Sequence, residues 1–394
     1  MELHLLLLCS DRNREMASET KLWLMLLLFA ATCLQHCVHG RPQVPCLFIF
    51  GDSQVDCGNN NYLPVTSKVN FPPYGVDFPK GVTGRYTNGK LAVDILGELL
   101  GSPDFEPPYA DYIPPYANPY VSDVYYGVNY ASAGGGINNR TGSNLGQVYS
   151  LSQQINHHKS IISKIESQLN SKKKATEHLN QCLYYLDIGT NDYTINYFVT
   201  DLYSTSANYT IPEWTDHLHD EYYQLLKELH DLGARKFALS GVALLGCRPY
   251  QIDLYGTEGC VEHLNDAVLL FNKGLRPLVD KLNEEYSDSK FMYVNYTAIQ
   301  SSAFPDFINY PACCQLEHFF GLCEYKGTYC KNRDKYAFWD GSHTTEAFNK
   351  MAAEKSYHDP KGSFTYPMDI KTLVKPSRKE GLKSVTEPMM HASM

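Results

Sequence analysis

The amino-acid sequence predicts an α/β protein with a mainly parallel sheet and helices on both of its faces. Short apolar runs that are typical of buried strands recur along the chain, and a helix-patterned segment separates most of them. The strand candidates are 46–50, 128–132, 183–188, 237–245 and 291–294. Strands that alternate with helices in this way are characteristic of parallel sheets.

The intervening segments carry apolar residues at helical spacing. Helices are predicted over 91–100, 151–169, 264–282 and 345–355. A further helix follows Thr210, carries apolar residues from Leu218 to Leu232 on one face and stops at Gly233. Two of them begin with a capping box, Ser150–Gln153 and Thr210–Glu213, in which side chains at both positions bond the first backbone N–H groups.

Three strand candidates end in polar turns that contain glycine, namely Gly51–Ser53, Ser132–Gly136 and Gly189–Asp192. Ligands of α/β proteins bind at the carboxyl ends of the parallel strands. We therefore expect the three turns to meet at one edge of the sheet and to form the functional site there.

The N-terminus is typical of a secretory signal. The apolar run Leu22–Leu34 follows Lys21 and precedes Val38-His39-Gly40, whose small residues suit signal peptidase. The run is too short to span a bilayer comfortably, so no stable membrane insertion is expected. We interpret residues 1–40 as a signal peptide, with Met16 as a possible true start, and the protein as secreted and extracellular.

Composition favours one globular domain after this leader. The chain has 394 residues, of which 43% are hydrophobic and 20% charged, and no linker interrupts 41–368. Residues 41–368 are therefore predicted to form one domain and 369–394 a polar tail. The net charge is −9 and no basic stripe is present, which argues against nucleic-acid binding.

Cysteines and glycosylation sequons agree with the secretory route. Sequons at Asn139, Asn208 and Asn295 predict N-glycans. Twelve cysteines are present, and Cys9, Cys33 and Cys37 fall in the leader, so an odd number remains. Cys247 can pair with Cys260 across a loop, and disulfides are expected within the cluster Cys313, Cys314, Cys323 and Cys330. A zinc site is disfavoured because no histidine pair accompanies the cluster, and Cys182 is predicted to be a buried free thiol.

Ser53, His343 and Asp340 are candidates for a nucleophile, a base and the acid that orients the base. Ser53 follows a buried strand and a glycine, so its hydroxyl is expected at the sheet edge. The spacing Asp340-Gly-Ser-His343 lets the carboxylate reach Nδ1–H while Nε2 faces outward. The structural alternatives are an ordinary turn at Ser53 and a helix cap or surface pair at the other two residues.

Two further residues are candidates for stabilising an oxyanion. Gly134 offers a backbone N–H that no side chain shields, and Asn191 offers a side-chain amide. The alternatives are a flexible turn at Gly134 and an Asx turn at the end of a strand for Asn191.

Taken in order, these segments resemble the conserved blocks of plant GDSL esterase/lipases, a branch of the SGNH hydrolases. The resembling blocks are 50–61, 84–90, 129–136, 189–192 and 338–346, and Tyr366-Pro-Met368 is similar to the C-terminal end of the family. The resemblance covers roughly residues 45–375, and five blocks in the same order make it specific.

The resemblance implies a flavodoxin-like three-layer α/β/α fold and hydrolysis of carboxylic esters through an acyl-enzyme. It implies Ser53 as nucleophile, His343 as base and Asp340 as its orienting acid. It also implies an oxyanion hole made by the Ser53 backbone, Gly134 and Asn191. The expected partner is a small-molecule or polymeric ester, and neither a metal nor an organic cofactor is required.

The chain departs from the family pattern at two positions. Gln54 replaces the leucine of the family name, and Thr344 replaces the proline that usually follows the histidine. Neither change removes a catalytic group. Two rival functions stay open: an acyltransferase that uses the same residues, and a secreted glycoprotein with a silent site that binds lipid or wall polymer.

Overall fold

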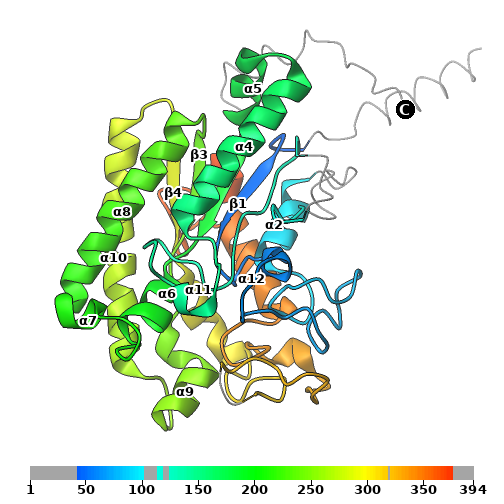
Figure 1. The fold of residues 1–394 in the computed structure, drawn as a ribbon, viewed down its shortest axis with the longest axis vertical. Helices are drawn as coiled ribbons and strands as arrows, with labels where there is room; N and C mark the ends of the chain where they lie inside the picture. The colour runs from blue at the N-terminus through cyan, green and yellow to red at the C-terminus, as the bar shows by residue number, and fades with distance from the viewer. Residues whose placement is uncertain (1–41, 102–112, 119–123, 318–319, 376–394) are drawn as a thin grey trace, which may run out of the picture.

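A five-stranded sheet forms the centre of the molecule (Figure 1). The computed structural model describes residues 42–101, 113–118, 124–317 and 320–375. The strands lie in the order β1 (Leu47–Gly51), β2 (Leu183–Asp187), β3 (Lys236–Ser240), β4 (Lys290–Val294) and β5 (Thr365–Tyr366). The first four are parallel and β5 pairs antiparallel with β4. The predicted α/β class with a mainly parallel sheet is confirmed.

The predicted strand 128–132 lies in the expected place but is not a regular strand. It runs along the free edge of β1, where the Ile49 N–H donates to Val128 O at 3.1 Å and the Tyr130 N–H donates to Ile49 O at 2.8 Å. Strand geometry in this segment is confined to Asn129, which forms a bridge with Ile49 and another with Pro115. The Asn129 side chain donates to Val55 O and accepts from the Ala131 N–H, which ties the segment to the turn after β1. With this segment at the edge, the order of the sheet is that of a flavodoxin-like fold.

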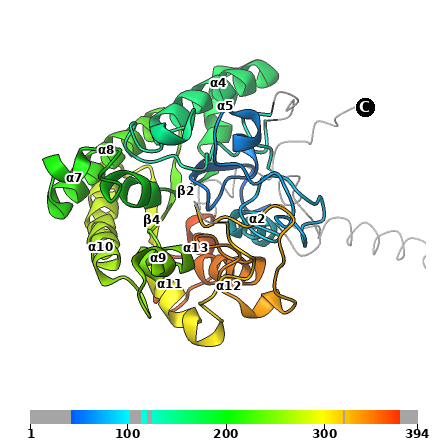
Figure 2. The same ribbon diagram turned by 60° about the horizontal axis from the view of Figure 1, so that its bottom comes forward.

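Helices cover both faces of the sheet (Figure 2). One face carries α4 (Leu151–Leu169), α5 (Lys172–Leu179), α8 (Ile211–Asp231) and α10 (Glu262–Glu285). The other carries α2 (Ala92–Leu100), α11 (Tyr296–Ala303), α12 (Glu346–Tyr357) and α13 (Ile370–Leu373). The short elements are α6 (Thr190–Asp192), α7 (Thr205–Asn208), α9 (Pro249–Tyr255), η1 (Asn59–Tyr62), η2 (Ser143–Leu145), η3 (Tyr193–Tyr197), η4 (Leu245–Cys247), η5 (Phe304–Asp306) and η6 (Arg333–Lys335).

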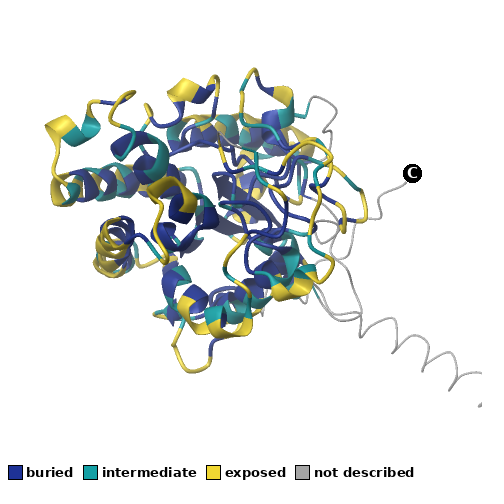
Figure 3. Cartoon of the chain, turned by 90° about the horizontal axis from the view of Figure 1, so that it is seen from below, coloured by how far each residue is buried: buried dark blue, intermediate teal, exposed yellow. Residues whose placement is uncertain are grey.

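Alternate residues of each strand enter two separate cores, as the two-residue period of a strand requires. In β1, Phe48 and Phe50 pack with α4, α8 and α10, whereas Leu47 and Ile49 pack with α2, α12 and α13. Figure 3 shows the buried strands at the centre, with exposed residues mainly on the outer sides of the helices and on loops. Because both faces are buried, the strands are continuous apolar runs, which is the pattern seen in the sequence.

The predicted capping boxes are confirmed. The Ser150 N–H donates to Gln153 Oε1 at 3.0 Å, and the Thr210 N–H donates to Glu213 Oε2 at 2.8 Å. These bonds satisfy N–H groups that have no partner within the helix, and they fix where α4 and α8 begin.

The described cysteines form four disulfides, and one of them corrects a prediction. Cys182 is not a free thiol: it is bonded to Cys46, and both residues directly precede neighbouring strands whose register places them side by side. The predicted pair Cys247–Cys260 is confirmed, and the cluster pairs as Cys313–Cys330 and Cys314–Cys323. Among the described residues the free thiol is Cys57, which is buried.

The packed part of the chain extends beyond the predicted domain end at residue 368. Ile370 and Leu373 on α13 are fully buried against the α2–α12 side of the sheet, so the segment to residue 375 belongs to the core and not to the tail. The predicted signal peptide and residues 376–394 lie outside the described residues. Within the described ranges, no helix combines the length and apolar character needed to cross a bilayer.

Candidate active site

The turn after β1 places Ser53 at the carboxyl edge of the sheet. Gln154 on α4 holds this turn, because its Oε1 accepts from the Gly51 N–H at 2.9 Å and its Nε2 donates to Gly51 O at 2.8 Å. A Cβ on Gly51 would lie 2.4 Å from Asp187 O, so only glycine lets β1 approach β2 this closely. The next residue, Asp52, is fully buried, and Ser53 is 8% exposed.

The structure brings Ser53, His343 and Asp340 into one hydrogen-bonded chain. The Ser53 hydroxyl donates to His343 Nε2 at 2.8 Å, although the two residues are 290 positions apart. On the other side of the ring, Nδ1–H donates to the Asp340 carboxylate, 2.9 Å from each oxygen. Asp340 is fully buried and His343 is 7% exposed, so the pair lies in a low-dielectric environment that strengthens its interaction.

Asp340 is held by partners that sequence reasoning did not find. The Tyr74 hydroxyl donates to Asp340 Oδ2 at 2.6 Å and accepts from the Cys323 N–H at 3.0 Å. The backbone N–H groups of Ser342 and His343 donate to Oδ1 at 2.8 Å each. Burial raises the pKa of Tyr74 well above its ordinary value, so this hydroxyl stays a donor. Tyr74 lies in a Pro-rich loop 266 residues before Asp340, and no local pattern links the two.

Two backbone N–H groups beside Ser53 are available to a ligand. The N–H groups of Ser53 and Gly134 make no hydrogen bond to any other described residue. Gly134 has φ of 90°, and a Cβ there would lie 2.6 Å from Leu145 Cδ1. The glycine is therefore required by both backbone conformation and space, in agreement with its selection from the sequence.

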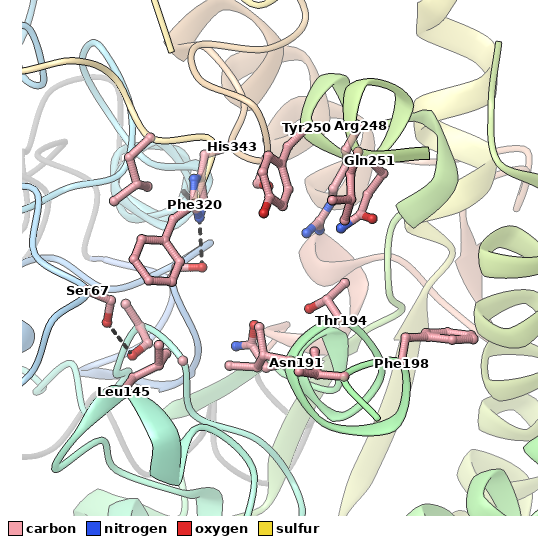
Figure 4. Close-up of a pocket in the computed structure, with 18 of the residues that line it drawn as sticks. Ser67, Leu145, Asn191, Thr194, Phe198, Arg248, Tyr250, Gln251, Phe320 and His343 are labelled. Atoms are coloured by element: carbon pink, nitrogen blue, oxygen red, sulfur yellow. Dashed lines mark hydrogen bonds between the residues drawn. The ribbon is translucent and has the colours of Figure 1, made fainter. Parts of the chain in front are cut away.

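Asn191 on α6 reaches the same place with its side chain (Figure 4). Its Nδ2 donates to Gly135 O at 2.9 Å, which uses one of its two N–H bonds and fixes the amide. The residue lines the cavity that also contains Ser53, Gly134 and His343. In an Asx turn, the structural alternative, Asn191 Oδ1 would accept from the Tyr193 N–H, but that N–H donates to Thr190 O instead.

Two buried carboxylates fix the loops that carry these donors. Asp56 accepts from the Gly58, Asn59 and Ala133 N–H groups, and so ties the turn after β1 to the residue before Gly134. Asp192 accepts from the Ile137 and Asn138 N–H groups and from the Thr141 hydroxyl at 2.7 Å. Burial raises the pKa of each carboxyl to about 6. Both residues lie within the sequence blocks quoted above, but nothing in those blocks indicates which backbone groups they hold.

The two departures from the family pattern leave the hydrogen-bonded chain intact. Gln54 is half-buried, and its Nε2 lies 3.5 Å from Ser342 O, so it spans the nucleophile turn and the histidine loop. The Thr344 hydroxyl donates to Asn349 Oδ1 at 2.5 Å, just before α12 begins. Each replacement side chain therefore has a polar partner of its own.

A cavity of about 330 Å³ opens beside Ser53 and His343. Its walls are mainly apolar and come from η2, η3 and the loop after it, α9, the start of α10 and the loop before η6. The apolar lining comprises Leu145, Ile195, Phe198, Val199, Leu202, Leu254, Leu264, Phe320 and Leu322. Leu202, Leu254 and Phe320 are also more than half exposed, so they form an apolar rim.

One group of possible metal ligands occurs in the described part of the chain. Cys46, His178 and Cys182 lie within ligand distance of one another, before the start of β1 and β2, whereas Ser53 follows the end of β1. Because Cys46 and Cys182 are joined in a disulfide, neither offers a thiolate.

A serine, a histidine and a buried aspartate in this arrangement, at the carboxyl edge of a parallel sheet, define the class of serine hydrolases. Comparison with known proteins identifies the family. The profile of the GDSL-like lipase/acylhydrolase family matches residues 47–356. A GDSL esterase/lipase of Arabidopsis thaliana is 40% identical over 85% of this chain and 93% of its own length, and a second is 39% identical over 89% and 96%. The chain belongs to the GDSL-like lipase/acylhydrolase family, a family of ester hydrolases.

Proposed function

We propose that the protein hydrolyses carboxylic esters through an acyl-enzyme on Ser53. The observation that carries the proposal is the unbroken chain from the Ser53 hydroxyl through His343 to buried Asp340, with contacts of 2.8 and 2.9 Å. A hydroxyl is a weak nucleophile at neutral pH, and an adjacent base with an oriented ring is what activates it.

In the first step His343 Nε2 takes the Ser53 proton while Oγ attacks the ester carbonyl. The carbonyl oxygen gains negative charge, which the N–H groups of Ser53 and Gly134 and the Asn191 amide stabilise. Nε2–H then protonates the leaving alcohol. In the second step His343 activates water, which attacks the acyl-enzyme and releases the acid. Asp340 holds the ring with Nδ1 protonated and stabilises the imidazolium that forms in both steps.

The mainly apolar cavity supports an ester with a hydrocarbon portion. Leu145, Ile195, Phe198, Leu254 and Phe320 line the cavity beside Ser53, so a hydrocarbon chain that enters it leaves water for apolar contacts. Each buried CH₂ group contributes roughly 0.8 kcal/mol of binding.

A fluorophosphonate probe tests the assignment of Ser53. We expect the wild-type protein to gain one covalent label by intact mass and Ser53→Ala to gain none. Ser67→Ala is the matched control, because Ser67 lines the same cavity without contacting His343, and it should label as the wild type does. Labelling of Ser53→Ala would refute the assignment.

We also propose that the protein is secreted and N-glycosylated, from the leader, the sequons and the disulfides. Asn139 and Asn208 are exposed, whereas Asn295 is half-buried and caps α11 by accepting from the Ala298 N–H. The first two are therefore the better acceptors. Protein purified from the medium of secreting plant cells should lose mass on glycosidase treatment; an unchanged mass would contradict glycosylation.

A further inference from the structure

Arg248 places a buried positive charge at the wall of the substrate cavity. It precedes α9, is 4% exposed and lines the cavity together with Ser53 and His343. In Figure 4 its guanidinium extends from α9 toward the open space opposite Asn191 and Thr194. Its side chain makes no hydrogen bond and no ion pair within 4.0 Å to any described residue.

The charged groups around Arg248 act on it only from a distance. Asp52, Asp340 and Asp187 stabilise its charge, while burial opposes it. Asp340 is already bonded to His343 and Tyr74. Burial and the nearby Asp187 raise the pKa of Asp52 to about 7, so that group is partly neutral at neutral pH.

A guanidinium in this position has donors to offer. It stays protonated in proteins and carries five N–H bonds. Leaving such donors buried without an acceptor costs free energy, so native proteins pair them with protein, water or ligand. Here the space in front of the donors is the substrate cavity.

Gln251 adds a neutral donor at the same wall. It follows Arg248 by three residues, so the two side chains leave the same side of the first turn of α9. It is 7% exposed, its amide also makes no hydrogen bond to another described residue, and Figure 4 shows it beside Arg248. A cation next to an amide donor matches the oxygen atoms of a carboxylate or phosphate.

We propose that Arg248 and Gln251 bind an anionic group of the substrate, so that the preferred esters carry a carboxylate or phosphate besides the ester that is cleaved. The proposal rests on the proposed function for its chemistry, and it names the substrate class of the same site. The apolar walls take the hydrocarbon portion, and the two α9 side chains take the charged end.

The competing explanation is that Arg248 serves only as a counter-ion for Asp52 and Asp187. In that case its removal would lower the rate on every ester equally or destabilise the fold. Anion binding predicts a selective loss, because only the charged substrate would lose its partner.

Matched pairs of substrates separate these explanations. Mono-4-nitrophenyl glutarate and 4-nitrophenyl valerate share an acyl length and differ in a terminal carboxylate against a methyl. 1-Hexanoylglycerol 3-phosphate and 1-hexanoylglycerol place the charge on the alcohol side instead. We expect wild-type kcat/KM to favour the anionic member of at least one pair, by about tenfold or more for a charged hydrogen bond. The pair that shows the preference identifies the source of the anion.

The preference should fall to near unity in Arg248→Met and by a smaller factor in Gln251→Leu. Arg276→Met, on the exposed side of α10, is the control and should keep the wild-type ratio. If Arg248→Met does not fold, Arg248→Lys must still reduce the ratio, because an ammonium lacks the forked donor geometry. Equal rates on both members of both pairs, or equal losses on both members in the variants, would overturn the proposal.

Calorimetry on Ser53→Ala separates this proposal from the hydrolytic one. Hexyl phosphate and hexanoate should bind that variant more tightly than 1-hexanol, and adding Arg248→Met should remove the difference. If the anions bind but the fluorophosphonate does not label the wild type, only the proposal of ester hydrolysis is contradicted. Labelling with no preference for either anion over 1-hexanol would contradict only the anion site.

Discussion

Asn191→Ala tests whether the amide at the cavity wall acts in the transition state or only holds the loop. The substitution removes the second N–H of Nδ2, which points into the cavity, together with the 2.9 Å bond to Gly135 O. Loss of one oxyanion donor raises the barrier by about 3 kcal/mol, which is roughly a hundredfold in kcat. Loss of the bond to Gly135 costs about 1 kcal/mol of folding free energy.

Asn196→Ala is the matched control for the structural part of the effect. Asn196 is buried on the adjacent η3, donates to Thr141 Oγ1 at 2.9 Å and accepts from the Thr205 hydroxyl at 2.5 Å. It does not line the cavity. We expect Asn196→Ala to lower the melting temperature at least as much as Asn191→Ala does, while its kcat stays within about threefold of the wild type.

The assay measures kcat, KM and melting temperature on the same preparations with a short-chain 4-nitrophenyl ester. For Asn191→Ala the fall should appear in kcat with KM nearly unchanged, because the donor acts mainly on the developing charge. Asn191→Asp should be slower still, since a carboxylate would face the oxyanion. The reasoning is refuted if Asn191→Ala melts early yet turns over at the wild-type rate, or if Asn196→Ala loses as much kcat as Asn191→Ala.

Two further substitutions probe groups behind the site. Tyr74→Phe removes the hydroxyl that donates to Asp340, so kcat should fall by about fivefold with KM unchanged, as steady-state kinetics would show; unchanged kcat would mean that the N–H donors alone hold the carboxylate. His158→Phe tests a buried histidine whose pKa burial lowers to about 3. In the unfolded chain this histidine takes up a proton near pH 6.5. Between about pH 6.5 and 3 the folded state therefore binds fewer protons than the unfolded state. The contribution of His158 to the free energy of unfolding falls as pH drops through this range, by roughly 2 kcal/mol at pH 5. Urea titrations at pH 7 and 5 give the change in unfolding free energy for each protein. That change should be about 2 kcal/mol less favourable in the wild type and in His263→Phe, an exposed control, than in His158→Phe; the same change in all three would contradict the reasoning.

Local signals in the sequence were sufficient for most of the fold. The capping boxes at Ser150 and Thr210 and the continuous apolar strands appear in the structure as predicted, because each depends on neighbours in sequence. The segment 128–132 shows the limit of such signals. Its apolar content predicts a strand, and its backbone does bond along β1, but strand geometry is confined to Asn129, which bridges Ile49 and Pro115.

Pairings between distant residues were beyond the reach of local patterns. Cys46 and Cys182 are 136 residues apart, and only the register of β1 against β2 makes them neighbours. An odd number of cysteines fixed that a thiol must remain, but not that it is Cys57. The place of Cys182 at the start of a predicted strand indicates burial but not which strand lies beside it, so the prediction of a free thiol there is wrong.

The active-site residues likewise fall into those that local sequence blocks indicate and those that only the fold brings to the site. Ser53, Gly134, Asn191 and the pair Asp340–His343 lie in short ordered blocks, which is why sequence reasoning assembled them into one site. Tyr74 bonds Asp340, Gln154 bonds the Gly51 backbone and Arg248 lines the cavity, and all three come from segments without such a pattern. Their positions depend on how loops pack over the sheet edge, which is a property of the whole fold.

Asp56 and Asp192 hold the loops that carry the oxyanion donors, and the ionised form that bonds these loops best is the form that stabilises the fold less. Asp56 and Asp192 bond several N–H groups best as carboxylates, yet burial raises the pKa of each to about 6. Because the folded pKa exceeds the unfolded value near 3.9, the stability from these groups is full below that value and is lost as pH rises through about 6. Ionisation above pH 6 therefore costs folding free energy while it strengthens the bonds that position Gly134 and the loop after it. The two carboxyls therefore bond the loops most strongly above about pH 6, whereas they contribute most to the free energy of unfolding below it.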